Sequence, residues 1–576
     1  MKKIVKCSTY LVLIILTLVS FFFASKVNLT DKTTIWESLK FFTLIPPLVA
    51  ITLAFLTKNI VLSLFFGIFS GTLLVSFVNV KNSIFVVIGN SFTNLISTII
   101  NSMADPWNAG ILLQVMAIGG LIALISKMGG TYAIAQTLSK KAKSARSSQL
   151  ITWILGLFVF FDDYANSLIV GPIMRPVTDK QKISREKLSF IVDATAAPIA
   201  GIAFVSTWIG YELSLIQSEL TELPEKTSAY SIFIETIPYR FYNIFILIFV
   251  FATIILLKEF GPMFKAERRA RLTGKLTDDN STVPNIDENE NLKSETLKNK
   301  YIWNAIIPIL TLIITSFIGF YINGYNALEG EILQKVKETP LSLNSIRETY
   351  SNSDASVVLF MSAILAGIVA MVMGITQKVF DAKEAVDTWI EGWKSMMITV
   401  VILLLAWSIA DIIKNQLAAD EFLAVTLGNT IPAFFIPSVI FLLGSIISFS
   451  TGTSYGTMGI LMPLAIPLAS SASGGDMTLI TASIGAVLTG AIFGDHCSPI
   501  SDTTILSSMG TSCDHMDHVK TQLPYAIFIA SISVIFGFLP AGFGISPIIT
   551  LPIGFCIIIL TLFFIGKSPV KRKENI

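Results

Sequence analysis

Several acidic residues stand in stretches of the sequence that are otherwise apolar. Asp162 and Asp163 follow a run of aromatic and aliphatic residues, Asp193 ends a second such run, and Asp495 and Asp502 flank a short polar motif. The same short segments contain no Lys or Arg, so a structural ion pair is hard to build within them. A carboxyl group in a low-dielectric environment binds a proton readily and releases it when a cation arrives. This is the chemistry of proton–cation exchange.

Oxygen-bearing side chains surround these carboxylates in the sequence. Hydroxyl, amide and exposed backbone oxygens can replace the hydration shell of a small cation such as Na⁺. The alternative is that Ser and Thr only hold packed helices together. The predicted ion-binding residues are Asp162, Asp163, Asn166, Asp193, Thr195, Thr453, Ser454, Asp495, Ser498, Asp502 and Thr503. Asp411 is a further acidic residue, less securely placed in an apolar segment.

The histidines and cysteines point to no resident metal. His496 stands between Asp495 and Cys497, but adjacent residues on a helix point about 100° apart and cannot face one ion. A proton-relay or structural role is therefore predicted for His496. His515 and His518 share a helix face at i,i+3, a spacing that would let both bind one metal ion. The predicted topology places this run at the cytoplasmic membrane surface, where such a run is more typical of a solvated helix cap. The four cysteines show no paired spacing, so neither a disulfide framework nor a structural zinc site is predicted, and no cofactor is expected.

The composition places these residues in a membrane protein. Of the 576 residues, 53% are hydrophobic and only 14% are charged, and the mean hydropathy is +0.71. Soluble proteins carry about 25% charged residues, so water could not solvate several soluble domains of this composition. Intrinsic disorder needs low hydrophobicity and high charge, and is excluded. The net charge of +2 gives no reason to expect nucleic acid as a partner.

The apolar stretches predict an all-α polytopic protein with about 12 transmembrane helices, because a crossing needs about 20 apolar residues. They lie near 8–25, 41–57, 59–78, 110–128, 188–209, 240–257, 302–321, 356–377, 395–413, 478–494, 523–543 and 546–566. An uncleaved first helix is favoured over a signal peptide, since Phe22 stands where a small residue would precede the cleavage site.

Two further apolar stretches, 149–174 and 433–470, are broken by Asp, Gly and Pro and do not fit simple crossings. Basic residues flank the first stretch on both sides, from Lys140 to Arg146 and from Arg175 to Lys187. Positive residues mark the cytoplasmic side, so this segment is predicted to enter the membrane and return as a re-entrant hairpin. The second stretch has no Lys or Arg and is predicted to enter from outside. The same rule places both termini in the cytoplasm.

The two broken stretches resemble each other at a constant offset of 288 residues, which sets Gly156 against Gly444 and Gly171 against Gly459. Two alike units of opposite orientation form an inverted repeat, in which ion sites lie near the midplane where broken helices meet. The predicted division is 1–40, first helix and external loop; 41–257, first repeat; 258–300, polar cytoplasmic linker; 301–543, second repeat; and 544–576, last helix and basic tail.

The eleven-residue run from Gly494 to Thr504, GDHCSPISDTT, strongly resembles the signature of the NhaC family of sodium/proton antiporters. The segments 161–166, 193–198, 207–212 and 521–525 are also similar to motifs of that family, and the resemblance covers about 44–539. It implies a multi-pass carrier of the bacterial inner membrane, with a scaffold domain, a mobile transport domain that holds both hairpins, and a scaffold-mediated homodimer as one arrangement. It implies Na⁺ and H⁺ as the transported ions.

Family resemblance does not fix the substrate, so three alternatives remain beside Na⁺/H⁺ antiport by alternating access. The first is Na⁺- and H⁺-coupled exchange of small carboxylates such as malate and lactate, which the neutral, hydroxyl-rich second break leaves open. The second is an intramembrane aspartyl protease, disfavoured because Asp163-Tyr164 has the wrong order and Ile492 stands where a Gly is needed. The third is an ion channel, which inverted broken helices disfavour. The favoured reading is a carrier and not an enzyme.

Overall fold

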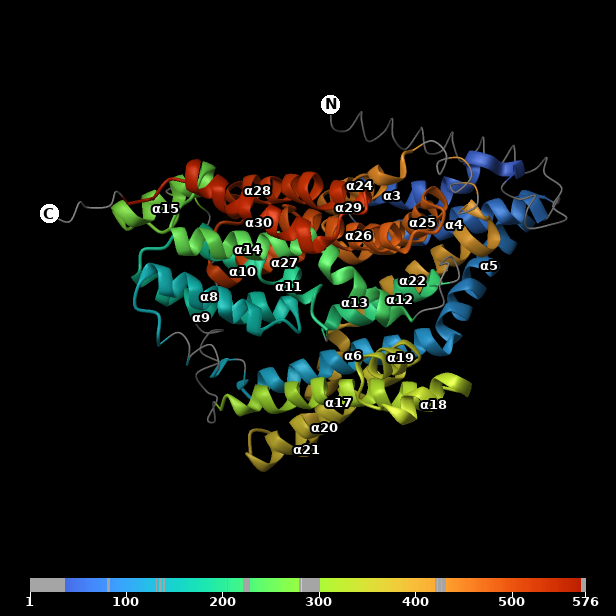
Figure 1. The fold of residues 1–576 in the computed structure, drawn as a ribbon, viewed down its shortest axis with the longest axis horizontal. Coiled ribbons are helices and arrows are strands. Elements are labelled where there is room, and N and C mark those ends of the chain that lie inside the picture. The colour runs from blue at the N-terminus through green and yellow to red at the C-terminus, as the bar shows by residue number, and fades with distance from the viewer. Residues whose placement is uncertain are drawn as a thin grey trace.

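A computed structural model gives the fold of the chain (Figure 1). It describes residues 37–570 with the exception of 58, 80–82, 131, 134–136, 138–139, 205, 221–227, 279–280, 282–300, 420–421, 423–425 and 427–430. Every regular element among these residues is a helix, and an isolated bridge between Glu259 and Lys567 is the one pairing of extended backbone there. The predicted all-α class is confirmed. The predicted first helix, 8–25, lies outside the described residues.

Twelve helical segments in the described part of the chain are long and apolar enough to cross a membrane. They contain α3 (Ile45–Thr57), α4 (Ile60–Asn79), α5 (Ile84–Ala104), α6 (Pro106–Lys127), α17 (Trp303–Ala327), α20 (Ala355–Thr376), α22 (Met397–Asp411), α24 (Ile436–Thr451), α25 (Ser454–Ser473), α26 (Met477–Cys497), α28 (His515–Ile532) and α30 (Pro547–Phe564). In addition, α13 (Ala229–Thr236) and α14 (Phe241–Leu256) belong to a pair of segments bent by 45° at Arg240. The predicted number of about 12 spans is confirmed, although some of the helices that make up the twelve are not the predicted ones.

One span is missing from the prediction, and one predicted span is wrong. The prediction omits α5, because Asn, Ser and Thr side chains interrupt its apolar pattern. The stretch 188–209 is not one crossing helix but divides into α10 (Arg185–Ala194), α11 (Ala197–Ala200) and α12 (Thr207–Ser218). Its apolar composition hides these breaks, because nearly the whole stretch is buried in protein, where irregular backbone can find partners.

Both broken stretches form a helix, a short break and a second helix. Helix α8 (Ala145–Phe158) ends before Asp162, and α9 (Asp163–Lys180) begins at the second carboxylate. In the other unit, Gly452 separates α24 from α25 with a φ of 68°, a left-handed conformation that glycine adopts at little cost. The helices of each unit contact each other. The sequence therefore located both breaks, while the entry of each unit from one side of the membrane stays a prediction.

The packing of the two halves shows the same repetition. Helix α3 packs on α4 in the first half, as α17 packs on α20 in the second. Helices of one half also pack on helices of the other: α22 of the second half packs on α4 of the first, and α6 of the first half packs on α20 of the second. Figure 1 shows α3 and α4 toward the upper edge of the bundle and α17 and α20 toward the lower edge.

A buried ion pair lies between the helices α12 and α14. Glu212 in α12 is fully buried and pairs with Arg240, at 2.9 Å between Oε2 and Nη2. Arg240 also donates to the Gly201 carbonyl and to the Thr236 hydroxyl, so the charges are well satisfied. Removing one partner of such a pair leaves an uncompensated buried charge and costs about 3–5 kcal/mol. The pair holds α12 against the start of α14.

Candidate functional site

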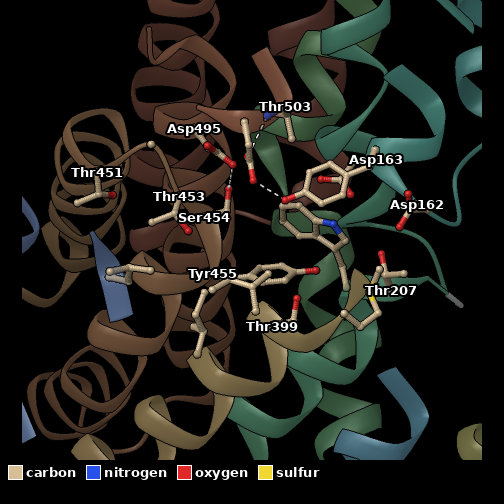
Figure 2. Close-up of a pocket in the computed structure, with 18 of the residues that line it drawn as sticks. Asp162, Asp163, Thr207, Thr399, Thr451, Thr453, Ser454, Tyr455, Asp495 and Thr503 are labelled. Atoms are coloured by element: carbon tan, nitrogen blue, oxygen red, sulfur yellow. Dashed lines mark hydrogen bonds between the residues drawn. The ribbon is translucent and has the colours of Figure 1, made fainter. Parts of the chain in front are cut away.

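A cavity of about 240 Å³ lies where the two breaks meet (Figure 2). The α8–α9 break and the start of α12 form one side, and the α24–α25 break with α26 and α27 (Asp502–Thr511) forms the other. Residues from α4, α22 and the end of α21 (Ala382–Ser395) complete the wall. Elements of both halves of the chain therefore build one cavity.

Four carboxylates line this cavity: Asp162, Asp163, Asp495 and Asp502. None of the described residues that line it is a Lys, Arg or His. Figure 2 shows Asp495 and Ser454 on one side and Asp162 and Asp163 on the other. Of the predicted site residues, seven line the cavity: Asp162, Asp163, Thr453, Ser454, Asp495, Asp502 and Thr503.

Asp495 faces the α24–α25 break. Its Oδ2 accepts a hydrogen bond of 2.8 Å from the Ser454 hydroxyl. Its Oδ1 is buried and has no hydrogen-bond partner among the described residues. The Thr207 hydroxyl, which also lines the cavity, is likewise buried and unpartnered within the described chain. Buried polar atoms are normally satisfied, so these two oxygens call for a ligand or water.

Close helix packing brings Asp495 to this position. A Cβ added at Gly494 would lie 2.5 Å from the Phe449 nitrogen and 2.5 Å from the Ser445 carbonyl oxygen, so only glycine permits this approach of α26 to α24. The Ser448 hydroxyl then donates across the interface to the Ala491 carbonyl. The Ser498 hydroxyl donates to the Phe449 carbonyl at 2.6 Å. Ser498 therefore holds the break in place and does not line the cavity.

Asn166 and Thr195 also lie outside the cavity. The Asn166 amide donates to the Gly156 carbonyl at 2.8 Å and to the Thr195 carbonyl at 2.7 Å. The Thr195 hydroxyl donates back to the Ile191 carbonyl at 2.8 Å. Asn166 thus joins α9 to the end of α8 and to the break after α10. Both residues position the first break.

Aromatic residues that the sequence reading did not select complete the cavity. Tyr164 donates to the Asp502 carboxylate, and Trp208 hydrogen-bonds to Asp163. The Tyr455 ring stacks on Tyr211, with ring centroids 4.4 Å apart, and meets Trp208 edge to face. The sequence holds one signal for these aromatic residues: Tyr164 directly follows the Asp pair, and Tyr455 directly follows Ser454. Aromatic residues are common in apolar segments, so this signal was weak.

Asp193 belongs to a second, fully buried polar cluster beside the cavity. Its Oδ2 accepts from the Gln522 amide at 2.7 Å, and its Oδ1 accepts from the Ser507 hydroxyl at 3.4 Å. His518 Nε2 lies 3.8 Å from the Asp193 carboxylate and 2.9 Å from Gln522 Oε1. His518 Nδ1 is 2.8 Å from the Ser508 hydroxyl.

This cluster continues toward a less buried residue. The Ser508 hydroxyl lies 3.2 Å from His515 Nδ1, and His515 is only half-buried. His496 contributes its carbonyl oxygen as an acceptor for Gln522, while its ring contacts the Tyr242 hydroxyl at 2.7 Å. His496 and His518 therefore lie around Asp193, and Ser508 links His518 to the half-buried His515. A neutral histidine ring has one nitrogen that donates and one that accepts a hydrogen bond, so these contacts form a continuous chain of polar groups from Asp193 to His515.

Comparison with known proteins supplies independent information. The sequence model described as the Na⁺/H⁺ antiporter family matches residues 8–203 and 199–542. A Haemophilus influenzae protein described only as uncharacterized is 34% identical over 511 residues, which cover 87% of this chain and 91% of that protein.

Two shorter similarities have named activities. The malate-2H⁺/Na⁺-lactate antiporter of Bacillus subtilis is 30% identical over 205 residues, which cover 33% of this chain and 39% of that protein. A second H. influenzae protein, described as an uncharacterized Na⁺/H⁺ antiporter, is 36% identical over 110 residues, or 18% of this chain and 22% of that protein.

Proposed function

Because the chain belongs to the Na⁺/H⁺ antiporter family, we propose that it exchanges Na⁺ for H⁺ across a bacterial inner membrane by alternating access. The cavity between the two breaks is the proposed cation site. One observation carries this proposal: four carboxylates converge on a cavity whose described lining has no cationic side chain. Such a site is anionic when it is deprotonated, so a cation or protons must balance it.

Na⁺ would be held by oxygen atoms from both halves. The unpartnered Oδ1 of Asp495 and the hydroxyl of Thr207 are available without breaking a hydrogen bond to a described residue. Asp163 and the hydroxyls of Thr453 and Thr503 line the same space. Carboxylate and hydroxyl oxygens are suitable ligands for a hard cation. Protons compete with Na⁺ for the same carboxylates, which couples the two fluxes.

The Asp193 cluster would pass protons between the cavity and the surface near His515. Gln522 contacts both Asp193 and the carbonyl of His496, which follows Asp495 directly in α26. The cluster thus adjoins the cation site without contributing to its described lining. We therefore assign Asp193 and His518 to proton transfer and not to Na⁺ coordination.

The site's position between the halves suits alternating access. Two of the walls come from broken helices and the others from α4, α21 and α22. Movement of the broken helices against these walls would open the cavity to one side at a time. In this proposal the termini are cytoplasmic, the broken helices form the transport domain, and a homodimer forms through the remaining scaffold helices.

Flux measurements with purified protein in liposomes test the function. We expect Na⁺ added outside acid-loaded vesicles to dissipate the pH gradient, with saturation as Na⁺ rises, because each cation that enters releases protons. Protein-free vesicles and K⁺ in place of Na⁺ are the controls. If no monovalent cation dissipates the gradient, the Na⁺/H⁺ assignment is wrong.

A second candidate function follows from the similarity to the malate-2H⁺/Na⁺-lactate antiporter. Na⁺- and H⁺-coupled exchange of small carboxylates would need a cationic or amide donor for the substrate carboxylate. Arg175 is the nearest candidate in the sequence, but it contacts the Ser512 hydroxyl and is not in the described lining. Adding malate or lactate in the same flux assay distinguishes the two functions. Gradient dissipation that requires malate or lactate would favour this second function.

A further inference from the structure

A basic pocket lies at the end of the bundle where α15 (Gly261–Thr273) and the C-terminal segment meet (Figure 1). Its volume is about 830 Å³, and α15 and the residues after α30 form its walls. The bridge between Glu259 and Lys567 joins these walls, because each residue donates its backbone N–H to the other's carbonyl at 2.8–3.0 Å. The pocket is separate from the cation cavity, with which it shares no lining residue.

Helix α15 presents one mixed face to this pocket. Apart from Pro262, the lining residues of the helix recur three and four positions apart, which places them on a single side. They include Phe264, Lys265, Arg268 and Leu272. The opposite side, with Met263 and Ala270, is buried against the protein. An amphipathic helix with basic and apolar residues on its free face is typical of a membrane interface.

The charges of the pocket are largely uncompensated. Lys265, Arg268 and Lys567 are exposed, and none of them forms an ion pair with a described residue. Arg269 is already paired with Glu186 at 2.8 Å. Beside these cations, Leu272 and Ile565 are 59% and 60% exposed. The pocket therefore offers positive charge and apolar surface together.

The geometry points to a binding site for an anionic phospholipid, with the phosphate among Lys265, Arg268 and Lys567 and the acyl chains along Ile565 and the end of α30. A phosphate group complements the three cations, and the exposed apolar residues need a hydrophobic neighbour. A free phosphate ion would satisfy the charge but leave Leu272 and Ile565 in water. A phospholipid satisfies both, and the site lies where apolar helices end and charged residues begin.

The site adjoins α10 through two ion pairs. Arg269 of the pocket holds Glu186, and the neighbouring Lys187 is buried and pairs with Glu259 at 2.8 Å. Both residues stand in the first turn of α10, whose other end carries Asp193. The lipid would thus stabilise the position of α15 against α10. Because the cavity does not take part, this inference stands or falls independently of the proposed transport function.

Native mass spectrometry of the purified full chain tests the site, with phosphatidylglycerol and phosphatidylcholine of identical acyl chains as probes. We expect the wild type to retain phosphatidylglycerol preferentially. The double variant Lys265→Gln/Arg268→Gln should weaken that retention by roughly 25-fold, since each cation near an anionic headgroup contributes about fivefold. Retention of phosphatidylcholine should not change.

The double variant Lys140→Gln/Lys141→Gln is the matched control, because it removes two exposed charges outside the pocket. It should retain phosphatidylglycerol as the wild type does. Equal loss in both double variants, or equal retention of the two lipids by the wild type, would overturn the inference. An excess of inorganic phosphate should not displace the lipid, and displacement by phosphate would overturn the lipid assignment in favour of a free-anion site. The melting temperature of each variant in detergent verifies that it is folded.

Discussion

Replacing Asp495 by Asn is expected to reduce Na⁺-driven proton flux at least about 100-fold. The change removes a buried charge beside the α24–α25 break, where Oδ1 has no hydrogen-bond partner among the described residues. The Asn side-chain oxygen can still accept the hydrogen bond from Ser454, so the local fold should survive. Loss of one partner from a buried charged interaction costs about 3–5 kcal/mol, which corresponds to a factor above 100. The gradient-dissipation assay in liposomes measures the effect.

Asp476→Asn is the matched control for this variant. Asp476 caps the other end of the same helix, accepting from the Thr478 N–H at 2.9 Å, and it is exposed and far from the cavity lining. Asn caps helices as well as Asp, so flux should stay close to the wild-type value. If Asp495→Asn retained wild-type flux, the cavity would not be the cation site.

The second large effect is expected from Asp193→Asn, which should separate proton movement from Na⁺ binding. The variant should bind Na⁺ within about twofold of the wild type, because Asp193 is not part of the described cavity lining. Its Na⁺-driven proton flux should fall at least about tenfold, since general proton transfer by a positioned side chain typically contributes 10²–10⁴-fold. Binding of radioactive Na⁺ to the purified variant and flux in liposomes provide the two measurements.

Asp495→Asn is the reciprocal control, since it should lose Na⁺ binding together with flux. His518→Gln offers a further comparison: it removes a titratable ring 3.8 Å from Asp193 and should slow flux without weakening Na⁺ binding. Should Asp193→Asn lose Na⁺ binding to the same extent as Asp495→Asn, Asp193 would have to be counted among the cation ligands.

The sequence alone located the parts of the site that depend on local chemistry. Asp162–Asp163 and Gly452–Thr453 stand at the two breaks because a carboxylate pair and a glycine are poor choices for an apolar helix interior. The offset of 288 residues that aligns Gly156 with Gly444 relates the two broken stretches from sequence alone. These features need no knowledge of which helices become neighbours.

The remainder depends on tertiary packing. Asp193 and Asp495 stand in similar motifs, yet one joins a histidine cluster and the other faces the cavity, because different helices cover them. Asn166, Thr195 and Ser498 carry the expected polar groups, but these groups donate hydrogen bonds to backbone carbonyls. Glu212 pairs with Arg240, a residue 28 positions later in the chain. Partners of this kind are far apart in the chain, and no local pattern identifies them.

The most direct test of the account is the release of protons when Na⁺ binds. Purified protein in a weakly buffered detergent solution near neutral pH would be titrated with NaCl while the solution pH is recorded, with choline chloride as the ionic-strength control. We predict a saturable acidification in the wild type that is strongly reduced in Asp495→Asn, because Na⁺ and protons compete for the cavity carboxylates. Na⁺ binding without proton release, or acidification of equal size in Asp495→Asn, would contradict the proposal that this cavity exchanges Na⁺ for H⁺.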